Sequence, residues 1–180
     1  MCIRDSNKED YFYGVEAKKL KGTYILLDEA SVTGTANILM ASVLAEGITT
    51  IYNAACEPYI QQLCKLLCSM GAKIEGVGSN LLKIQGVKTL NGAEHRVLPD
   101  MIEIGSWIGL AAMTKSNIRI KNVSWENLGV IPNVFRSLGI NLIKENDDIV
   151  ISEHKNGYEI KNYIDGSILS ISDAPWPGFS

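Results

Sequence analysis

The stretch "LLCSMGAKIEGVGSNLLKI", residues 66–84, decides the fold because the chain contains a second version of it. The second version, "VFRSLGINLIKENDDIVI" at residues 134–151, has the same order of apolar helix end, glycine, short strand, turn and second strand. Gly71 and Gly139 occupy equivalent places after the last apolar residue of a helix, where a left-handed cap favours glycine. An internal duplication therefore explains the pattern better than two unrelated halves.

Apolar periodicity extends each copy in both directions. In the first copy we expect a strand at residues 24–27, helices at 34–46 and 57–70, and strands at 48–54, 72–78 and 80–87. In the second we expect helices at 100–114 and around 126–138, and strands at 117–123, 140–146 and 147–153. Pro132 lies inside the last helical pattern and predicts a late helix start or a kink. The repeated β-α-β-α-β-β order predicts a mixed α/β (α+β) fold.

The segment between the copies, "GVKTLNGAEHRVLPD" at residues 86–100, is polar and contains glycines and Pro99. Such a composition is typical of a domain boundary. We expect residues 15–98 to form the last part of one domain and residues 99–180 the start of a second, truncated one. The charged opening, "MCIRDSNKED", has no periodicity, so residues 1–14 are left outside the fold.

The composition excludes several classes of function. The 180 residues are 46% hydrophobic and 21% charged, with a formal net charge of −3, which argues against nucleic-acid binding through bulk charge. The sequence has no long uncharged apolar run and no signal-peptide pattern, so we expect no membrane partner and a cytoplasmic location. Cys64 and Cys68 are spaced for one helix face, but no further Cys or His completes a metal site. We therefore expect neither metal nor cofactor.

The cluster "SVTGT" at residues 31–35 lies between an apolar strand and an apolar helix. The simplest interpretation is that Ser31 or Thr33 caps the helix. Alternatively, the free amides of the first helical turn bind an anion, with the hydroxyls of Ser31, Thr33 and Thr35 as further donors. On local grounds the cap is favoured, and the absence of a GxxxxGK[ST] pattern leaves an ATP-type phosphate loop unsupported.

Two acids adjoin prolines at predicted helix starts: Glu57 before Pro58, and Asp100 after Pro99. A carboxylate at this position interacts favourably with the helix dipole, so each is most simply a helix-terminal acid. Asp100 also falls at the predicted domain boundary, where ligand clefts concentrate.

Several motifs together resemble one family, the UDP-N-acetylglucosamine 1-carboxyvinyltransferases among the enolpyruvyl transferases. They are "SVTGTANILMASVLAEG", "TTIYNAACEP", "SMGAKIEGVGSNLLKIQGV", "VLPDMIEIG" and "DAPWPGF", and the resemblance extends over about residues 15–180. It implies an inside-out barrel fold of two domains, each built from three β-α-β-α-β-β units. It also implies that this chain is a fragment holding two incomplete domains.

The resemblance implies transfer of the enolpyruvyl group of phosphoenolpyruvate to the 3-hydroxyl of UDP-N-acetylglucosamine. This reaction is the first committed step of peptidoglycan synthesis, on which cell-wall formation, cell shape and division depend. By similarity, the UDP-sugar binds the loop made of Glu29, Ala30, Ser31 and Val32, together with the adjoining Thr33 and Gly34. This moves the anion-binding interpretation above the simple cap, and both can hold at once. Glu57 and Asp100 match acidic positions near the interdomain cleft.

By the same resemblance, no catalytic residue lies within the chain. The family's N-terminal lysine and asparagine and its reactive-loop cysteine would precede Met1, and its catalytic aspartate would follow Ser180. Asp173 is not the counterpart of that aspartate, and Cys56 is not the reactive cysteine. We therefore expect the chain alone to be inactive.

Two positions depart from the family pattern. Glu29 stands where some members have lysine, and Cys56 stands where arginine is common, so anion binding here depends on backbone amides and hydroxyls. Two alternatives stay open. One is an enzyme like the shikimate-pathway transferase, 3-phosphoshikimate 1-carboxyvinyltransferase, and the other is a non-catalytic binding module of two units.

Overall fold

The computed structural model describes residues 2–3, 15–153 and 157–158. Its internal contacts divide the chain into two compact units, Met1–Arg96 and Val97–Ser180. No helix among the described residues has both the length and the apolar character needed to span a lipid bilayer.

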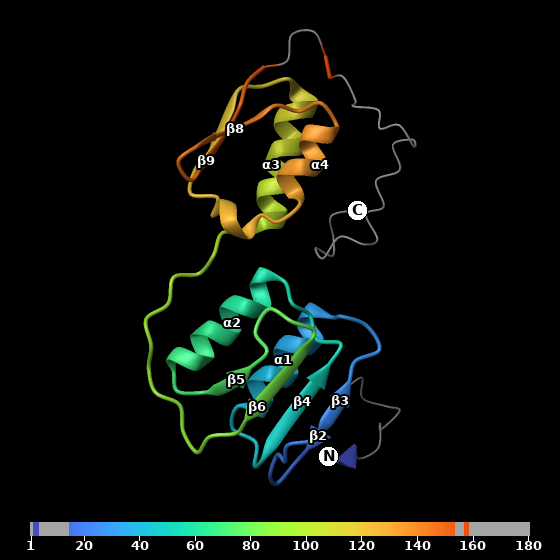
Figure 1. The fold of residues 1–180 in the computed structure, drawn as a ribbon, viewed down its shortest axis with the longest axis vertical. Coiled ribbons are helices and arrows are strands. Elements are labelled where there is room, and N and C mark those ends of the chain that lie inside the picture. The colour runs from blue at the N-terminus through green and yellow to red at the C-terminus, as the bar shows by residue number, and fades with distance from the viewer. Residues whose placement is uncertain (1, 4–14, 154–156, 159–180) are drawn as a thin grey trace, which may run out of the picture. The chain divides into compact units, whose positions relative to one another are not determined.

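The first unit is built on a four-stranded sheet with the order β3-β4-β6-β5 (Figure 1). Its strands are β3 (Tyr24–Leu26), β4 (Ile48–Tyr52), β5 (Lys73–Glu75) and β6 (Leu81–Gln85). β3 pairs parallel with β4, whereas β6 pairs antiparallel with both β4 and β5. A small antiparallel pair, β1 (Cys2–Ile3) and β2 (Val15–Glu16), precedes this sheet.

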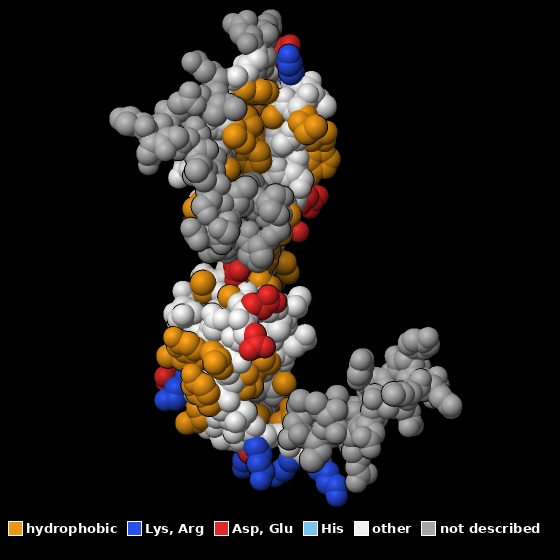
Figure 2. All heavy atoms as spheres, turned by 90° about the vertical axis from the view of Figure 1, so that its right-hand side faces the viewer, with side chains coloured by type: hydrophobic (Ala, Val, Ile, Leu, Met, Phe, Trp, Pro, Cys, Tyr) orange, Lys and Arg blue, Asp and Glu red, His pale blue; other side chains and the backbone are white. Residues whose placement is uncertain are grey.

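Helices α1 (Val32–Ser42) and α2 (Pro58–Ser69) cover one face of this sheet. Alternate residues of the central strands point toward them: Ile51 of β4, with Leu82 and Ile84 of β6, is fully buried against residues of both helices. Leu39 of α1 and Cys64 of α2 lie in the same cluster. The opposite residues of the strands are exposed, and Figure 2 shows apolar side chains at the surface of both units. Those on the uncovered face of the first sheet are Tyr24, Leu26, Ile48, Tyr52 and Leu81.

The second unit has a three-stranded antiparallel sheet in the order β7-β9-β8. Its elements are α3 (Met101–Thr114), β7 (Ile118–Ile120), the short 3-10 helix η1 (Trp125–Asn127), α4 (Ile131–Ser137), β8 (Leu142–Glu145) and β9 (Asp148–Ile151). Its core is apolar and formed by residues of the helices and of β8 and β9: Met101, Ile104, Ile108, Ile131, Phe135, Leu142, Ile149 and Ile151 are all buried.

The two units repeat one topology, as predicted. The order β4-β6-β5 in the first corresponds to β7-β9-β8 in the second, with α2 and α4 at equivalent places in the chain. Gly71 and Gly139 both have positive φ angles, of 107° and 84°, after α2 and α4 respectively. The predicted mixed fold of repeated units is therefore confirmed.

Most differences from the predicted elements lie at their ends. The strand predicted at residues 72–78 stops at Glu75, because Gly76 and Gly78 turn the chain with φ angles of 82° and 87°. The helix predicted around residues 126–138 is two elements, η1 and α4. Pro132 lies in the first turn of α4, so of the two predicted alternatives the late helix start is the one found.

Candidate functional site

The candidate site lies where the parallel strands β3 and β4 end side by side. Leu26 and Tyr52, their last residues, are register partners, so the loops at residues 27–31 and 53–57 leave the same edge of the sheet. The Leu27 amide donates to the Tyr52 carbonyl at 3.1 Å, and Asn53 Nδ2 donates to the Leu27 carbonyl at 3.0 Å. In open α/β sheets, ligands bind outside such carboxyl ends. We call these two loops, with the first turns of α1 and α2, the carboxyl edge.

Ser31 caps helix α1. Its backbone is extended, its Oγ accepts a hydrogen bond from the Gly34 amide at 3.1 Å, and its carbonyl accepts one from the Thr35 amide at 2.9 Å. The predicted cap is confirmed. The amides of Val32 and Thr33 come first in the helix and have no acceptor within it, so they add to the positive end of the helix dipole. This end of α1 is therefore chemically suited to an anion.

Gly34 allows this cap to be tight. A Cβ placed on Gly34 would lie 3.2 Å from both Cβ and Oγ of Ser31. Any side chain at this position would press against the capping residue. Because Gly34 has no side chain, Ser31 can lie close to the first turn of α1.

Thr35 is not available to a ligand. Its side chain is fully buried, and its Oγ1 accepts a hydrogen bond from the Ala55 amide at 2.9 Å. The hydroxyl therefore joins α1 to the loop after β4 instead of facing solvent, and the expectation that Thr35 supplies a donor to an anion is wrong. Of the three predicted hydroxyls, those of Ser31 and Thr33 remain, 3.4 Å apart at the exposed helix end.

Glu57 precedes helix α2 but does not cap it. Its carbonyl accepts hydrogen bonds from the Ile60 and Gln61 amides, at 2.9 and 3.1 Å, whereas its side chain makes no capping bond. Pro58 occupies the first turn. Glu57 as a residue is only 5% exposed, and its Oε2 has no hydrogen-bond partner among the described residues. Glu57 is thus at a helix terminus as predicted, but it is a buried acid, which the sequence did not indicate.

The carboxyl edge carries acids and no cation of its own. Asp28, Glu29 and Glu57 lie in its two loops, and residues 27–35 and 53–60 contain no Lys or Arg. Cys56 is half-buried there as a free thiol, and its carbonyl accepts a hydrogen bond from Gln61 Nε2 at 2.7 Å. Within these two ranges, the groups suited to attract an anion are the amides and dipoles at the helix starts.

Asp100 lies in the second unit and caps α3. Its Oδ1 accepts hydrogen bonds from the Ile102 amide at 2.8 Å and the Glu103 amide at 3.4 Å. The predicted helix-terminal acid is confirmed. The placement of Glu57 and Asp100 in one interdomain cleft stays a prediction.

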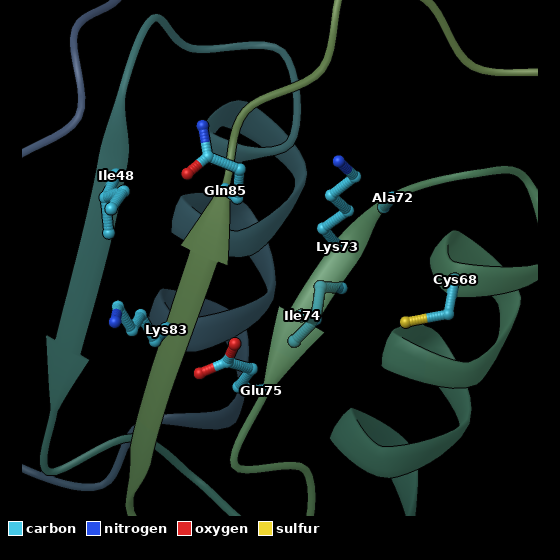
Figure 3. Close-up of a pocket in the computed structure, with 8 residues that line it drawn as sticks. All are labelled: Ile48, Cys68, Ala72, Lys73, Ile74, Glu75, Lys83 and Gln85. Carbon is cyan, nitrogen blue, oxygen red and sulfur yellow. The ribbon is translucent and has the colours of Figure 1, made fainter.

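A hollow of about 480 Å³ opens elsewhere on the first unit (Figure 3). Its lining comes from the three strands β4, β5 and β6 and from the end of α2 and the turn that follows: Ile48, Cys68, Ala72, Lys73, Ile74, Glu75, Lys83 and Gln85. Ile48 is the first residue of β4, whereas the carboxyl edge follows its last residue. The hollow is therefore separate from the candidate site.

Of the two cysteines of α2, Cys64 is buried in the core and Cys68 is exposed at the surface. Burial, and secondly the nearby Cys68 thiol, raises the pKa of the Cys64 thiol to about 11. Cys64 is thus a protonated apolar residue at neutral pH. No group of three or more metal-binding side chains occurs in the described part of the chain.

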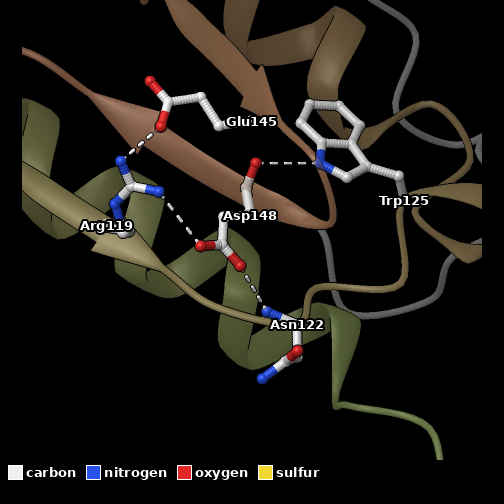
Figure 4. Close-up of polar contacts among 5 residues, drawn as sticks. All are labelled: Arg119, Asn122, Trp125, Glu145 and Asp148. Atoms are coloured by element: carbon white, nitrogen blue, oxygen red, sulfur yellow. Dashed lines mark hydrogen bonds and ion pairs between the residues drawn. The ribbon is translucent and has the colours of Figure 1, made fainter.

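The second unit holds a polar network that sequence reasoning did not find (Figure 4). Arg119 of β7 contacts Glu145 of β8 and, at 3.2 Å, Asp148 of β9. Asp148 also accepts a hydrogen bond from the Asn122 amide at 3.0 Å, and its carbonyl accepts one from Trp125 Nε1 at 3.1 Å. The Asn122 amide and then Arg119 lower the pKa of the Asp148 carboxyl. The network joins all three strands of this sheet.

Comparison with known proteins places the chain in a family. Residues 5–180 match the family described as EPSP synthase (3-phosphoshikimate 1-carboxyvinyltransferase). The chain is 66% identical over 168 residues to UDP-N-acetylglucosamine 1-carboxyvinyltransferase of Bacteroides thetaiotaomicron, covering 93% of this chain and 38% of that protein. It is 62% identical over 176 residues to the Porphyromonas gingivalis enzyme of the same name, covering 98% and 40%. The chain thus spans about 40% of the length of these relatives.

Solved structures agree on the fold. The enolpyruvyl transferase NikO from Streptomyces tendae superposes with a TM-score of 0.68 at 18% identity, covering 77% of this chain and 36% of that one. EPSP synthase from Acinetobacter baumannii gives 0.57 at 21% identity, covering 81% and 34%. The repeated topology, the sequence match and these superpositions lead to one conclusion: the chain belongs to the EPSP synthase (3-phosphoshikimate 1-carboxyvinyltransferase) family of enolpyruvyl transferases.

Proposed function

We propose that the protein carrying this chain transfers the enolpyruvyl group of phosphoenolpyruvate to the 3-hydroxyl of UDP-N-acetylglucosamine, with release of phosphate. The observation that carries the proposal is the identity of 62–66% over almost the whole chain to relatives named for this activity. The shikimate-pathway activity is the second candidate, because the family description names it. It is less favoured, since the EPSP synthase structures are only 21% identical to this chain.

Within this reaction, the part we assign to the chain is binding of the UDP-sugar at the loop Glu29, Ala30, Ser31, Val32, Thr33 and Gly34. The cap at Ser31 supports this assignment, since it fixes the first turn of α1 and leaves the Val32 and Thr33 amides directed out of the helix. A diphosphate there would gain from amide hydrogen bonds and from the helix dipole. Glu29 opposes it by charge repulsion, so binding should strengthen when that charge is removed.

The mechanism we propose for the intact enzyme is addition followed by elimination. In the addition, a base removes the proton of the sugar hydroxyl, whose oxygen bonds to C2 of phosphoenolpyruvate, while an acid protonates the alkene carbon C3. In the elimination, C3 loses a proton and the bond from C2 to the phosphate oxygen breaks, which restores the double bond and releases phosphate. Positively charged groups stabilise the phosphates. We assign neither the base nor the acid to a residue of this chain. The contribution of the chain is therefore to bind and orient one substrate, and the chain by itself should release no phosphate.

We further propose that the protein acts in the cytoplasm on small-molecule substrates and supplies peptidoglycan synthesis. The free thiols of Cys56, Cys64 and Cys68 fit a reducing compartment. The relatives at 62–66% identity come from bacteria and are named for an activity on UDP-N-acetylglucosamine. A product made from this sugar fits a precursor of the cell wall.

The test is a titration of UDP-N-acetylglucosamine into the intact protein, followed by an assay of phosphate release with phosphoenolpyruvate. Binding with turnover is expected. Activity on shikimate 3-phosphate instead would favour the second candidate. Binding of the UDP-sugar without turnover would favour a non-catalytic module.

A further inference from the structure

The hollow on the first sheet carries positive charge that the fold does not use (Figure 3). Lys73 of β5 and Lys83 of β6 both line it, together with Glu75. None of the ion pairs between described residues includes any of these three, although Glu75 is the register partner of Lys83. Two lysines and one glutamate give this lining a formal net charge of +1, whereas the whole chain carries −3.

The register of the sheet brings the two lysines together. Lys73 pairs with Gln85, and Glu75 with Lys83, so Lys73 and Lys83 are diagonal neighbours on adjacent strands. They extend from the same face, because register partners share a face and Gln85 is two residues after Lys83. Diagonal neighbours lie about 7–8 Å apart, within reach of long side chains. Two ammonium groups at this spacing can hold one oxyanion between them.

Protection of a sheet edge explains only one of the two lysines. A lysine on an edge strand discourages pairing with another chain, and β5 is an edge strand. Strand β6 lies between β4 and β5, so Lys83 belongs to an interior strand. The charge of Lys83 in the hollow therefore has a different reason.

The two copies of the repeat can be aligned at this part of the sheet. Asn53 and Asn122 come after the equivalent strands β4 and β7, and both have left-handed backbones, with φ angles of 59° and 54°. Thr50 and Arg119 each lie three residues before these asparagines. They therefore occupy equivalent places in the two units.

The second unit has a hollow at the equivalent place, but its lining is different. Arg119 and Val150 line this second hollow, which has a volume of about 340 Å³. Val150 is the register partner of Arg119, as Lys83 is of Thr50, so an apolar residue stands where the first hollow has a lysine. Arg119 itself contacts carboxylates of β8 and β9. The fold thus forms the hollow without free lysines, and their presence in the first unit is a property of that copy.

We propose that the hollow of the first unit binds a small organic anion, whose phosphate or carboxylate group is held between the ammonium groups of Lys73 and Lys83. Its volume of about 480 Å³ is usual for a small-molecule site. Ile48 and Ile74 also line it and offer apolar contact to the rest of the molecule. The hollow is separate from the carboxyl edge, so this inference goes beyond the proposed function and does not rest on it.

Cys68 provides a local measure of occupancy, because its exposed thiol lines the same hollow. In the intact protein, alkylation of Cys68 by iodoacetamide, an uncharged reagent, is followed by mass spectrometry of the peptide that carries it. The rate is compared in chloride, inorganic phosphate and acetate at equal ionic strength. The variants are Lys73→Gln, Lys83→Gln and Lys83→Arg. Lys88→Gln is the matched control, since Lys88 is an exposed lysine of the same unit outside the lining.

We expect phosphate at about 10 mM to slow alkylation of Cys68 about 3-fold or more in the wild type and in Lys88→Gln, as for a dissociation constant of about 1 mM. Lys73→Gln and Lys83→Gln should lose most of this protection, whereas Lys83→Arg keeps the charge and should retain it. Both lysines are exposed, so each variant should unfold at the wild-type temperature.

The acetate arm distinguishes the two kinds of anion. Stronger protection by phosphate supports a phosphorylated ligand, and stronger protection by acetate supports a carboxylate in the same site. Equal alkylation rates in chloride, phosphate and acetate overturn the inference. Protection that persists in both Lys73→Gln and Lys83→Gln also overturns it, because the anion would then bind elsewhere. The result does not depend on turnover, so loss of the proposed function leaves this test unaffected.

Discussion

The buried hydroxyl of Thr35 accepts the backbone N–H of Ala55 at 2.9 Å, and this bond joins helix α1 to the loop that follows strand β4. The two residues are far apart in the sequence, and both are buried. The bond therefore fixes the spacing between the starts of α1 and α2, both of which belong to the carboxyl edge.

Replacing Thr35 by Val should destabilise the first unit. The change keeps the shape of the side chain but leaves the Ala55 amide buried without an acceptor, at a cost of about 1 to 3 kcal/mol. Urea unfolding of the intact protein measures the effect. Thr33→Val, at the exposed neighbour, is the control and should change the free energy of unfolding by less than about 0.5 kcal/mol.

Ser31 offers a way to separate capping from anion binding. Ser31→Ala should lose about 1 kcal/mol of stability and also weaken UDP-sugar binding, because the cap that fixes the first helical turn is gone. Ser31→Asp retains a capping side chain and should keep stability, yet its charge should repel a diphosphate and weaken binding further. Calorimetric titration and urea unfolding of both variants provide the two readouts. Wild-type affinity in Ser31→Asp would count against a diphosphate at this helix end.

Glu29→Lys should tighten UDP-sugar binding several-fold at low salt. The change replaces a repulsive charge on the loop with an attractive one, and salt should reduce the gain because Glu29 is exposed. Affinity is measured at two ionic strengths. The same charge reversal at Glu94, outside the loop, is the control, and an equal gain there would show that only net charge matters.

The second unit should lose stability in acid through Asp148. The Asn122 amide and Arg119 lower the pKa of its carboxyl below the ordinary value of 3.8. The stabilisation is therefore fully present above about pH 4 and is lost as the pH falls through the lowered value. Asp148→Asn should be less stable than the wild type at pH 7 and should show a smaller loss between pH 4 and pH 2. Urea unfolding across this range tests the prediction, and parallel pH profiles for the two proteins would contradict it.

Gly86→Ala should prevent close packing in the first unit. A Cβ at this position would lie 1.6 Å from the Ala45 carbonyl oxygen, so the backbone must move. We expect a loss of about 3 kcal/mol or more, seen in urea unfolding. Gly92→Ala is the matched control, because nothing lies within 4 Å of its added Cβ.

Local patterns predicted the features that depend on neighbours in the sequence. The left-handed glycines at 71 and 139 each follow from the conformational preference of one residue in its immediate context. The same reasoning narrowed the cap of α1 to Ser31 or Thr33, and the effect of Pro132 to a late helix start or a kink. The repeat predicted that the two units share a topology, and the strand orders β4-β6-β5 and β7-β9-β8 agree with this prediction.

Features that depend on distant contacts were not predictable in this way. The burial of Thr35 results from its contact with Ala55, and only the folded sheet brings the two together. Glu57 is buried, and its position before Pro58 predicted only an acid at a helix terminus. Arg119 meets Glu145 and Asp148 because β9 lies between β7 and β8, an order that no local spacing reveals.

Among the residues that the structure describes, the main sheets of the two copies differ by one strand. In the first, β3 adds a parallel strand beside β4, whereas the sheet of the second, β7-β9-β8, is antiparallel throughout. The carboxyl edge at Ser31 depends on that parallel pair, because two strands must end at the same edge to present two helix starts together. A single peripheral strand can therefore decide whether a copy of this unit presents such an edge, while the core that the copies share stays the same.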